Sequence, residues 1–240
     1  MIIFIRKVRQ ELMAGNRIRK YLFYAIAEIF LVVIGILIAL KINTWNDGRK
    51  QQEIISSIYA IVKNDLETDI NIFKDIVALS DSKNEIFQKI IARQMTREDY
   101  NTCNNCVHLL AGFPDVEIEK RGYNLMLDNS TIFNPQADSL YIKINQFYRD
   151  FDTKISVNQQ EMYANHNDNW FYWKNNMPWF SAYFSGETNE EMIDYMLNTT
   201  DYVNRVTATH FLVYQKLNNQ LVAYQKQASE IVAEIESRSE

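Results

Sequence analysis

The hydrophobic positions of this 240-residue chain form one continuous run and three long periodic stripes. The run covers residues 21–40, and the stripes cover residues 55–91, 140–173 and 190–235. Within the stripes, apolar residues recur at spacings of three and four, which places them on one face of an α-helix. Six glycines and three prolines leave few turn signals for a strand-rich fold. The pattern predicts an all-α protein.

Three amphipathic helices must each cover an apolar face, and an antiparallel bundle of long helices does this. Shorter helices are predicted between the stripes, at about 97–110 and within 117–135. Thr96 and Asp99 resemble a capping box that begins the first of these. Gly48 precedes the first stripe and is a candidate hinge, so the continuity of the helix at that residue stays open.

The continuous run predicts a transmembrane helix over residues 17–46, followed by a separate domain over 47–240. Glu28 is the only charged residue in the run, and a helix of about 20 residues spans the roughly 30 Å hydrocarbon layer. A cleaved signal peptide has a shorter apolar region and a small-residue cleavage site, whereas this run continues into Lys41 and Ile42. We therefore expect a retained, single-pass anchor.

Charge is distributed unevenly along the chain. Residues 1–20 hold six basic residues and one acidic residue, a net charge of +5, whereas residues 41–240 hold 19 basic and 28 acidic residues, a net charge of −9. The positive-inside rule therefore predicts an inner-membrane protein with a cytoplasmic N-terminus and a periplasmic domain. The acidic balance of that domain argues against nucleic-acid binding, which requires clustered Lys and Arg.

Residues 1–16 are expected to form a cytoplasmic basic segment. Met1, Ile5, Val8 and Leu12 recur at helical spacing among basic residues, which is typical of an amphipathic helix on anionic membrane lipid. Short helices are marginal in water, so a basic tail without helical structure stays open as the alternative.

Glu28 shares one face of the membrane helix with Gly35 and Ala39. Small residues four apart allow helices to approach closely in lipid, and an intramembrane carboxylate usually faces protein or a water-filled cavity. This seam predicts a protein partner or a homo-oligomer through the transmembrane helix. Two alternatives remain: a carboxylate wetted or protonated near the cytoplasmic headgroups, and a role in ion or proton passage.

The chain resembles a family at three segments. The segment EIFLVVIGILIALKINTWN, preceded by RIRKYLFYAIA, is similar to the opening signature of an uncharacterised family of Bacteroidota membrane proteins, over about residues 18–50. The segments RGYNLMLDNSTIFNPQADSLYIKINQFY and YQKLNNQLVAYQKQASEIVAEIESRSE are similar to its middle and its helical end. Gly48 replaces an expected acidic residue. The resemblance implies an inner-membrane anchor and a periplasmic helical domain, and no activity.

Cys103 and Cys106 form a Cys-x-x-Cys motif in a compartment predicted to be oxidising. A structural disulfide and two packed thiols are both open, whereas a redox motif lacks the preceding strand. With His108 the cysteines make half of a zinc site, which would need His166 or His210 as a further ligand. No metal and no cofactor are predicted.

Residues 165–184 concentrate eight aromatic residues among asparagines. Trp170, Trp173, Trp179 and Phe180 are candidates either for a ligand or interface site or for a cap on the bundle core. Asp65, Glu67 and Asp69 are expected on a solvated helix face. No arrangement of Ser, His and Asp and no phosphate-binding loop is recognisable, so an enzyme is not predicted.

The predicted function is a membrane-anchored helical interaction or scaffold protein. The alternative is an extracytoplasmic ligand-binding or sensor domain that uses residues 165–184.

Overall fold

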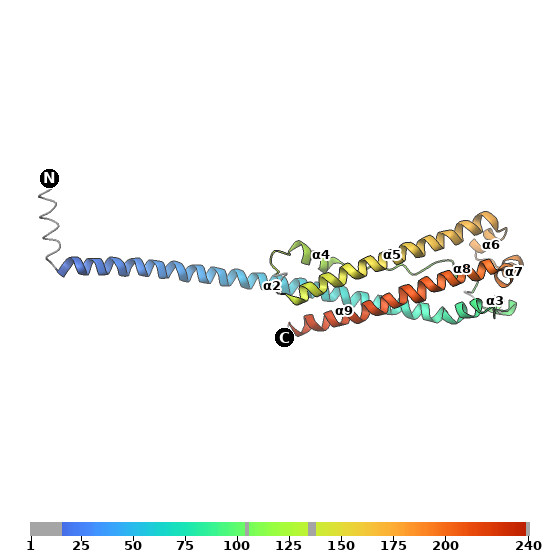
Figure 1. Ribbon diagram of the computed structural model, residues 1–240, viewed down its shortest axis with the longest axis horizontal. Helices are drawn as coiled ribbons and strands as arrows, with labels where there is room; N and C mark the ends of the chain where they lie inside the picture. Colours follow the sequence, from blue (N-terminus) through green and yellow to red (C-terminus); the bar gives the residue numbers. More distant parts are fainter. Residues whose placement is uncertain (1–15, 104–105, 134–137, 239–240) are drawn as a thin grey trace. The chain divides into compact units, whose positions relative to one another are not determined.

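The computed structural model describes the backbone of residues 16–103, 106–133 and 138–238, and all regular secondary structure within these ranges is helical. The chain divides into two compact units, Met1–Ile54 and Ile55–Glu240. Helix α2 (Asn16–Ile91) contributes to both units (Figure 1). The predicted basic segment 1–16 lies outside the described residues, except for Asn16.

The first unit exposes its apolar side chains. Every side chain from Tyr21 to Trp45 is exposed, although most of them are apolar. Exposed apolar surface on this scale is unfavourable in water and favourable in lipid. Within the described residues, α2 is the one helix long and apolar enough to cross a membrane. The backbone is helical on both sides of Gly48.

The second unit combines the three predicted stripes with shorter helices. After α2 its elements are α3 (Arg97–Thr102), α4 (Arg121–Asp128), α5 (Ser139–Asn176), α6 (Phe180–Phe184), α7 (Glu190–Asn198), α8 (Thr200–His210), the π-helical turn η1 (Phe211–Asn218) and α9 (Asn219–Ser237). α8, η1 and α9 follow one another without a break and form the third long helical segment.

The three long segments lie side by side within the second unit (Figure 1). The Tyr59 hydroxyl donates to the Asp138 carboxylate at 2.6 Å, which joins the beginning of this part of α2 to the beginning of α5. The His210 Nε2 atom lies 3.1 Å from the Asn84 Oδ1 atom, so α8 lies beside the C-terminal part of α2. α2 and α5 are therefore parallel, and α8–α9 is antiparallel to both. The predicted antiparallel bundle agrees with the course of α8–α9 but is wrong for α2 and α5, because a long connection between these two helices carries the chain back.

That connection, residues 92–138, begins with α3. The predicted capping box is confirmed: the Thr96 hydroxyl accepts from the Asp99 amide, and the Asp99 carboxylate accepts from the Thr96 amide. The helix ends at Thr102 rather than near Leu110. From Cys103 to Lys120 the described chain is turns and extended backbone, and we call this stretch the return segment.

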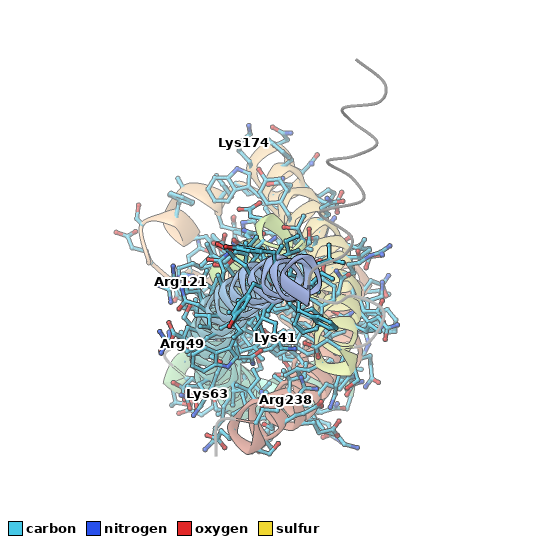
Figure 2. The ribbon with its side chains drawn as sticks, turned by 90° about the vertical axis from the view of Figure 1, so that its left-hand side faces the viewer. Lys41, Arg49, Lys63, Arg121, Lys174 and Arg238 are labelled. Atoms are coloured by element: carbon cyan, nitrogen blue, oxygen red, sulfur yellow. A yellow bond between two sulfur atoms is a disulfide. The ribbon has the colours of Figure 1, made fainter. Side chains whose placement is uncertain are left out.

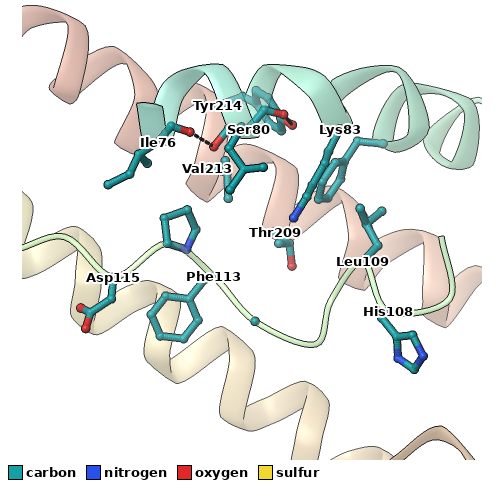
Figure 3. A pocket seen from close by; sticks show the side chains of 14 residues that line it. Ile76, Ser80, Lys83, His108, Leu109, Phe113, Asp115, Thr209, Val213 and Tyr214 are labelled. Atoms are coloured by element: carbon teal, nitrogen blue, oxygen red, sulfur yellow. Dashed lines mark hydrogen bonds between the residues drawn. The ribbon is translucent and has the colours of Figure 1, made fainter. Parts of the chain in front are cut away.

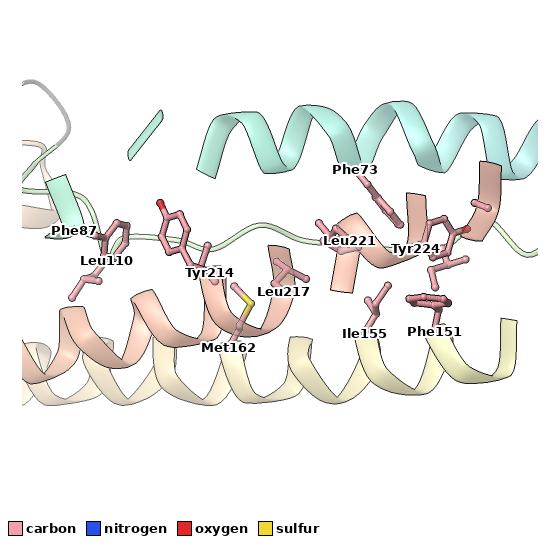
Figure 4. Close-up of a cluster of buried hydrophobic side chains, with 14 of the residues drawn as sticks. Phe73, Phe87, Leu110, Phe151, Ile155, Met162, Tyr214, Leu217, Leu221 and Tyr224 are labelled. Carbon is pink, nitrogen blue, oxygen red and sulfur yellow. The ribbon is translucent and has the colours of Figure 1, made fainter. Parts of the chain in front are cut away.

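The core lies between the three stripes (Figure 4). Phe73 from α2 and Phe147 from α5 contact the Tyr224 ring of α9, with ring centroids 4.8 Å and 4.7 Å apart. Leu217 and Leu221 continue the same layer and are fully buried. Rings and branched aliphatic side chains at helical spacing thus form one continuous apolar core, as the periodicity predicts.

Two acidic residues that were expected in solvent are buried. Asp65 is 2% exposed and Asp69 is 0% exposed, so the prediction of a solvated helix face is wrong for both, while Glu67 is exposed. The Asp65 carboxylate accepts from the Gly122 amide at 2.6 Å and from the Arg121 guanidinium at 3.1 Å. Charged groups are buried only when such partners are present.

Asp69 binds the return segment from the same helix face. Its two carboxylate oxygens accept from the Glu119 amide at 3.2 Å, and it also accepts from the Tyr224 hydroxyl. Burial raises the pKa of Asp69 to about 6, against the opposing effect of the hydrogen bonds from Tyr224 and Glu119. Asp69 thereby connects α2, the return segment and α9.

Gly122 allows α4 to approach α2 closely. A Cβ atom on Gly122 would lie 2.5 Å from the Val62 backbone nitrogen, which is far inside van der Waals contact. The position of α4 against α2 therefore depends on a residue without a side chain at this point.

The basic side chains lie around the outside of the helices, as Figure 2 shows for Lys63, Lys174 and Arg238.

Replacing Gly122 by alanine is expected to lower the free energy of unfolding by about 2 to 3 kcal/mol, because the new methyl group would force α4 away from α2. Gly112→Ala is the matched control, since a Cβ atom there meets nothing within 4 Å. Thermal unfolding followed by circular dichroism measures both. Equal stability of the two variants would contradict the close approach.

Candidate functional site

A cavity of about 310 Å³ lies at the end of the second unit where α5, α6 and the return segment meet. We call it the aromatic cavity. It is lined by His108, Leu110, Ala111, His166, Trp170, Trp173, Tyr183, Phe184 and Gly186. Its volume is within the range of small-molecule sites, about 300 to 1,000 Å³.

The aromatic segment builds two walls of this cavity by reversing direction after α5. Trp170 and Trp173 lie three residues apart on α5, and α6 brings Tyr183 and Phe184 back beside them. The ring centroid of Phe184 lies 4.7 Å from that of Trp170, with the rings perpendicular. Aromatic pairs favour this edge-to-face geometry.

The four aromatic residues that the sequence singles out differ in whether they line the cavity. Trp170 and Trp173 line the cavity, whereas Trp179 and Phe180 do not. Trp179 is buried behind the wall, with its ring centroid 5.7 Å from that of Trp173. Phe180 packs edge-on against Trp170 at 5.3 Å. The segment therefore provides both cavity wall and core cap.

Hydrogen bonds hold the inner wall in place. The Trp173 indole donates to the Tyr195 hydroxyl at 2.9 Å, and Tyr195 donates to the Asp201 carboxylate at 2.5 Å. Arg205 in turn donates to Asp201 at 2.9 Å. Buried aromatic residues with polar tips need such partners, and here the chain of contacts fixes the orientation of Trp173.

Tyr183 differs from Trp173 because its polar tip has no partner. Its side chain is 5% exposed, and its hydroxyl has no hydrogen-bond partner among the described residues. Burial raises the pKa of Tyr183 to about 12, so the phenol is neutral at physiological pH. A buried hydroxyl without a partner costs free energy.

Two imidazoles complete the polar part of the lining. The His108 ring lies 4.9 Å from the Tyr183 ring, and the His166 ring lies 5.6 Å from the Phe113 ring. Among the described residues, no Lys, Arg, Asp or Glu lines the cavity. The site therefore combines flat apolar surface with imidazole hydrogen-bonding groups.

Sequence reasoning did not single out Tyr183, Phe184 or the apolar part of the return segment. A signal for the first two exists, because they follow Phe180 by three and four residues and so lie on its side of a helix. His108 was considered only as a zinc ligand. Its approach to His166 depends on the path of the return segment, which no local pattern encodes.

Cys103 and Cys106 are joined by a disulfide, with their Cα atoms 5.5 Å apart. The sulfur atoms are therefore occupied, and the zinc half-site that they could form with His108 is not assembled. His210 is remote from it: this ring contacts Asn84 and Gln88, and burial lowers its pKa. Within the described residues, no three His, Cys, Asp or Glu residues are grouped to hold a metal ion.

Glu28, Gly35 and Ala39 are all exposed in the first unit. Spacings of seven and four residues place them on one face of α2. A Cβ atom on Gly35 would meet nothing within 4 Å. Among the described residues, no hydrogen bond or ion pair involves Glu28.

These features define an all-helical protein with one helix suited to crossing a membrane and a helical bundle that contains an aromatic cavity. The chain belongs to a family of unknown function, DUF6090, whose model matches residues 28–212. No curated protein and no solved structure matches the chain.

Proposed function

We propose that this protein is a single-pass membrane protein whose helical bundle binds a small ligand in the aromatic cavity. The observation that carries the proposal is the cavity itself, which is lined by four aromatic side chains, two imidazoles and apolar residues of the return segment. A concave, largely apolar site with a few polar groups is the usual form of a ligand site. The cavity favours ligand binding over assembly alone.

The lining favours an uncharged ligand that has a flat apolar face and polar edges. Trp170 and Phe184 offer ring surface for stacking, and the imidazoles of His108 and His166 offer hydrogen bonds. A charged ligand would be desolvated without a counter-ion, which is costly. A neutral carbohydrate meets these conditions, because its C–H face stacks on aromatic rings and its hydroxyls bind polar groups.

Replacing Trp170 by alanine is expected to weaken ligand binding about tenfold to a hundredfold, because it removes the stacking surface. Isothermal titration of the full chain with a panel of neutral mono- and disaccharides measures the affinity. Phe171→Ala is the matched control, since the neighbouring Phe171 is 52% exposed and lies outside the lining. The proposal fails if no sugar binds, or if both variants weaken binding equally.

The charge distribution supports an extracytoplasmic position for the bundle. Residues 1–20 carry a net charge of +5, and basic segments next to a membrane helix stay in the cytoplasm. Protease added outside intact spheroplasts is therefore expected to digest the bundle. If the bundle is digested only after the spheroplasts are lysed, the bundle lies in the cytoplasm and the proposed orientation is wrong.

A second candidate function is assembly through the membrane helix. Glu28 supports it, because a carboxylate exposed on an apolar helix is unfavourable in lipid unless another chain or water surrounds it. Gly35 and Ala39 on the same face would allow a partner helix to approach closely. The partner in this candidate is a second copy of the chain or another membrane protein.

Glu28→Ala is expected to lower the population of oligomers about tenfold, because the variant removes the polar contact between helices. Native mass spectrometry after mild detergent extraction counts the subunits. Leu37→Ala is the control, since this residue lies on the helix outside the Glu28 face. An unchanged distribution in Glu28→Ala would support a carboxylate wetted at the headgroups instead.

A further inference from the structure

A second cavity of about 340 Å³ lies between α2, the return segment and the junction of α8 with η1 (Figure 3). We call it the lysine cavity. Its lining shares only His108 with that of the aromatic cavity. Its lining combines charged groups, Lys83 and Asp115, with apolar side chains, among them Ile76, Leu79, Leu109, Phe113 and Val213.

The hydroxyl groups of the lining already donate their protons within the protein. Tyr214 donates to the Ser80 carbonyl at 2.5 Å, Ser80 donates to the Ile76 carbonyl at 2.9 Å, and Thr209 donates to the Arg205 carbonyl at 3.0 Å. A hydroxyl has one proton to donate. These three residues are therefore unable to donate a hydrogen bond to a bound molecule.

Lys83 and Asp115 are the charged groups of the lining. Within the described residues, no ion pair or hydrogen bond involves the Lys83 ammonium group. Figure 3 shows this group extending from α2 toward Thr209, while Asp115 points away from it on the far side of Phe113. The Lys83 ammonium therefore lies at one side of an apolar space with three donor protons available.

We propose that the lysine cavity binds an apolar monocarboxylate, with the carboxylate at the Lys83 ammonium and the hydrocarbon body against the apolar walls. The Lys83 ammonium matches one negative charge, since Asp115 lies apart from it on the far side of Phe113, and ionised partners form the stronger hydrogen bonds. A phosphate would bring a second charge and further acceptors for which the lining has no counterpart. An amine would be repelled by Lys83.

This inference does not rest on the proposed carbohydrate site. Among the described residues, the two linings share only His108, and Lys83 lines the lysine cavity alone, whereas Trp170, Trp173 and Phe184 line the aromatic cavity alone. Failure of one proposal therefore leaves the other standing, and the variants described below leave Trp170 and Tyr183 untouched.

The test uses the full chain in lipid nanodiscs with ω-fluorooctanoate as the probe, followed by fluorine NMR after subtraction of empty nanodiscs. Lys83→Met is expected to weaken probe binding about tenfold to a hundredfold, because it removes the ammonium and keeps an unbranched side chain. The corresponding neutral alcohol and the corresponding ammonium compound are expected to bind far more weakly than the carboxylate.

Lys74→Met is the matched control, since Lys74 is exposed on the same helix and lies outside the lining. Leu79 supplies a second pair of variants that need not disturb folding, because it lines the cavity and is 60% exposed. Leu79→Glu is expected to weaken binding by repulsion, whereas Leu79→Lys is expected to keep it. The proposal is overturned if the carboxylate shows no saturable binding, if the alcohol binds equally well, or if Lys83→Met binds like the wild type.

Discussion

Two buried carboxylates of α2 fasten the connection between α2 and α5 to the bundle, Asp65 at the start of α4 and Asp69 at the end of the return segment. Asp65 accepts the Gly122 amide, and Asp69 accepts the Glu119 amide together with the Tyr224 hydroxyl. Backbone amides in an irregular segment have no helical partner, so buried side-chain acceptors replace one. Removing either carboxylate would leave buried donors unsatisfied, which costs more than the hydrogen bond alone contributes.

The return segment is required because α2 and α5 are parallel. A chain that leaves the end of one helix must travel the length of the bundle before it begins a second helix in the same direction. Along this path the segment packs against the long helices with Val116 and Ile118 buried, and it forms one wall of both cavities. The same connection thus determines the topology and the two candidate binding sites.

The first unit exposes apolar side chains, which are unfavourable in water and would be favourable in lipid. In lipid the Glu28 carboxylate would be unfavourable, which is the physical basis of the proposed helix partner. The family model matches the chain from Glu28 to Leu212. This range includes Glu28, Gly35 and Ala39, and it includes the described lining residues of both cavities except Val213 and Tyr214.

Local pattern determined the helical class, the membrane-type helix, the three stripes and the capping box at Thr96, because each depends on residues close together in sequence. The sequence also identified the aromatic segment 165–184. It did not show that Trp170 lines the cavity whereas Trp179 is buried in the core. Only the tertiary structure decided the parallel course of α5 and the burial of Asp65 and Asp69. Their partners lie about 50 residues or more away in the chain, and such pairings depend on how the helices dock rather than on any local period.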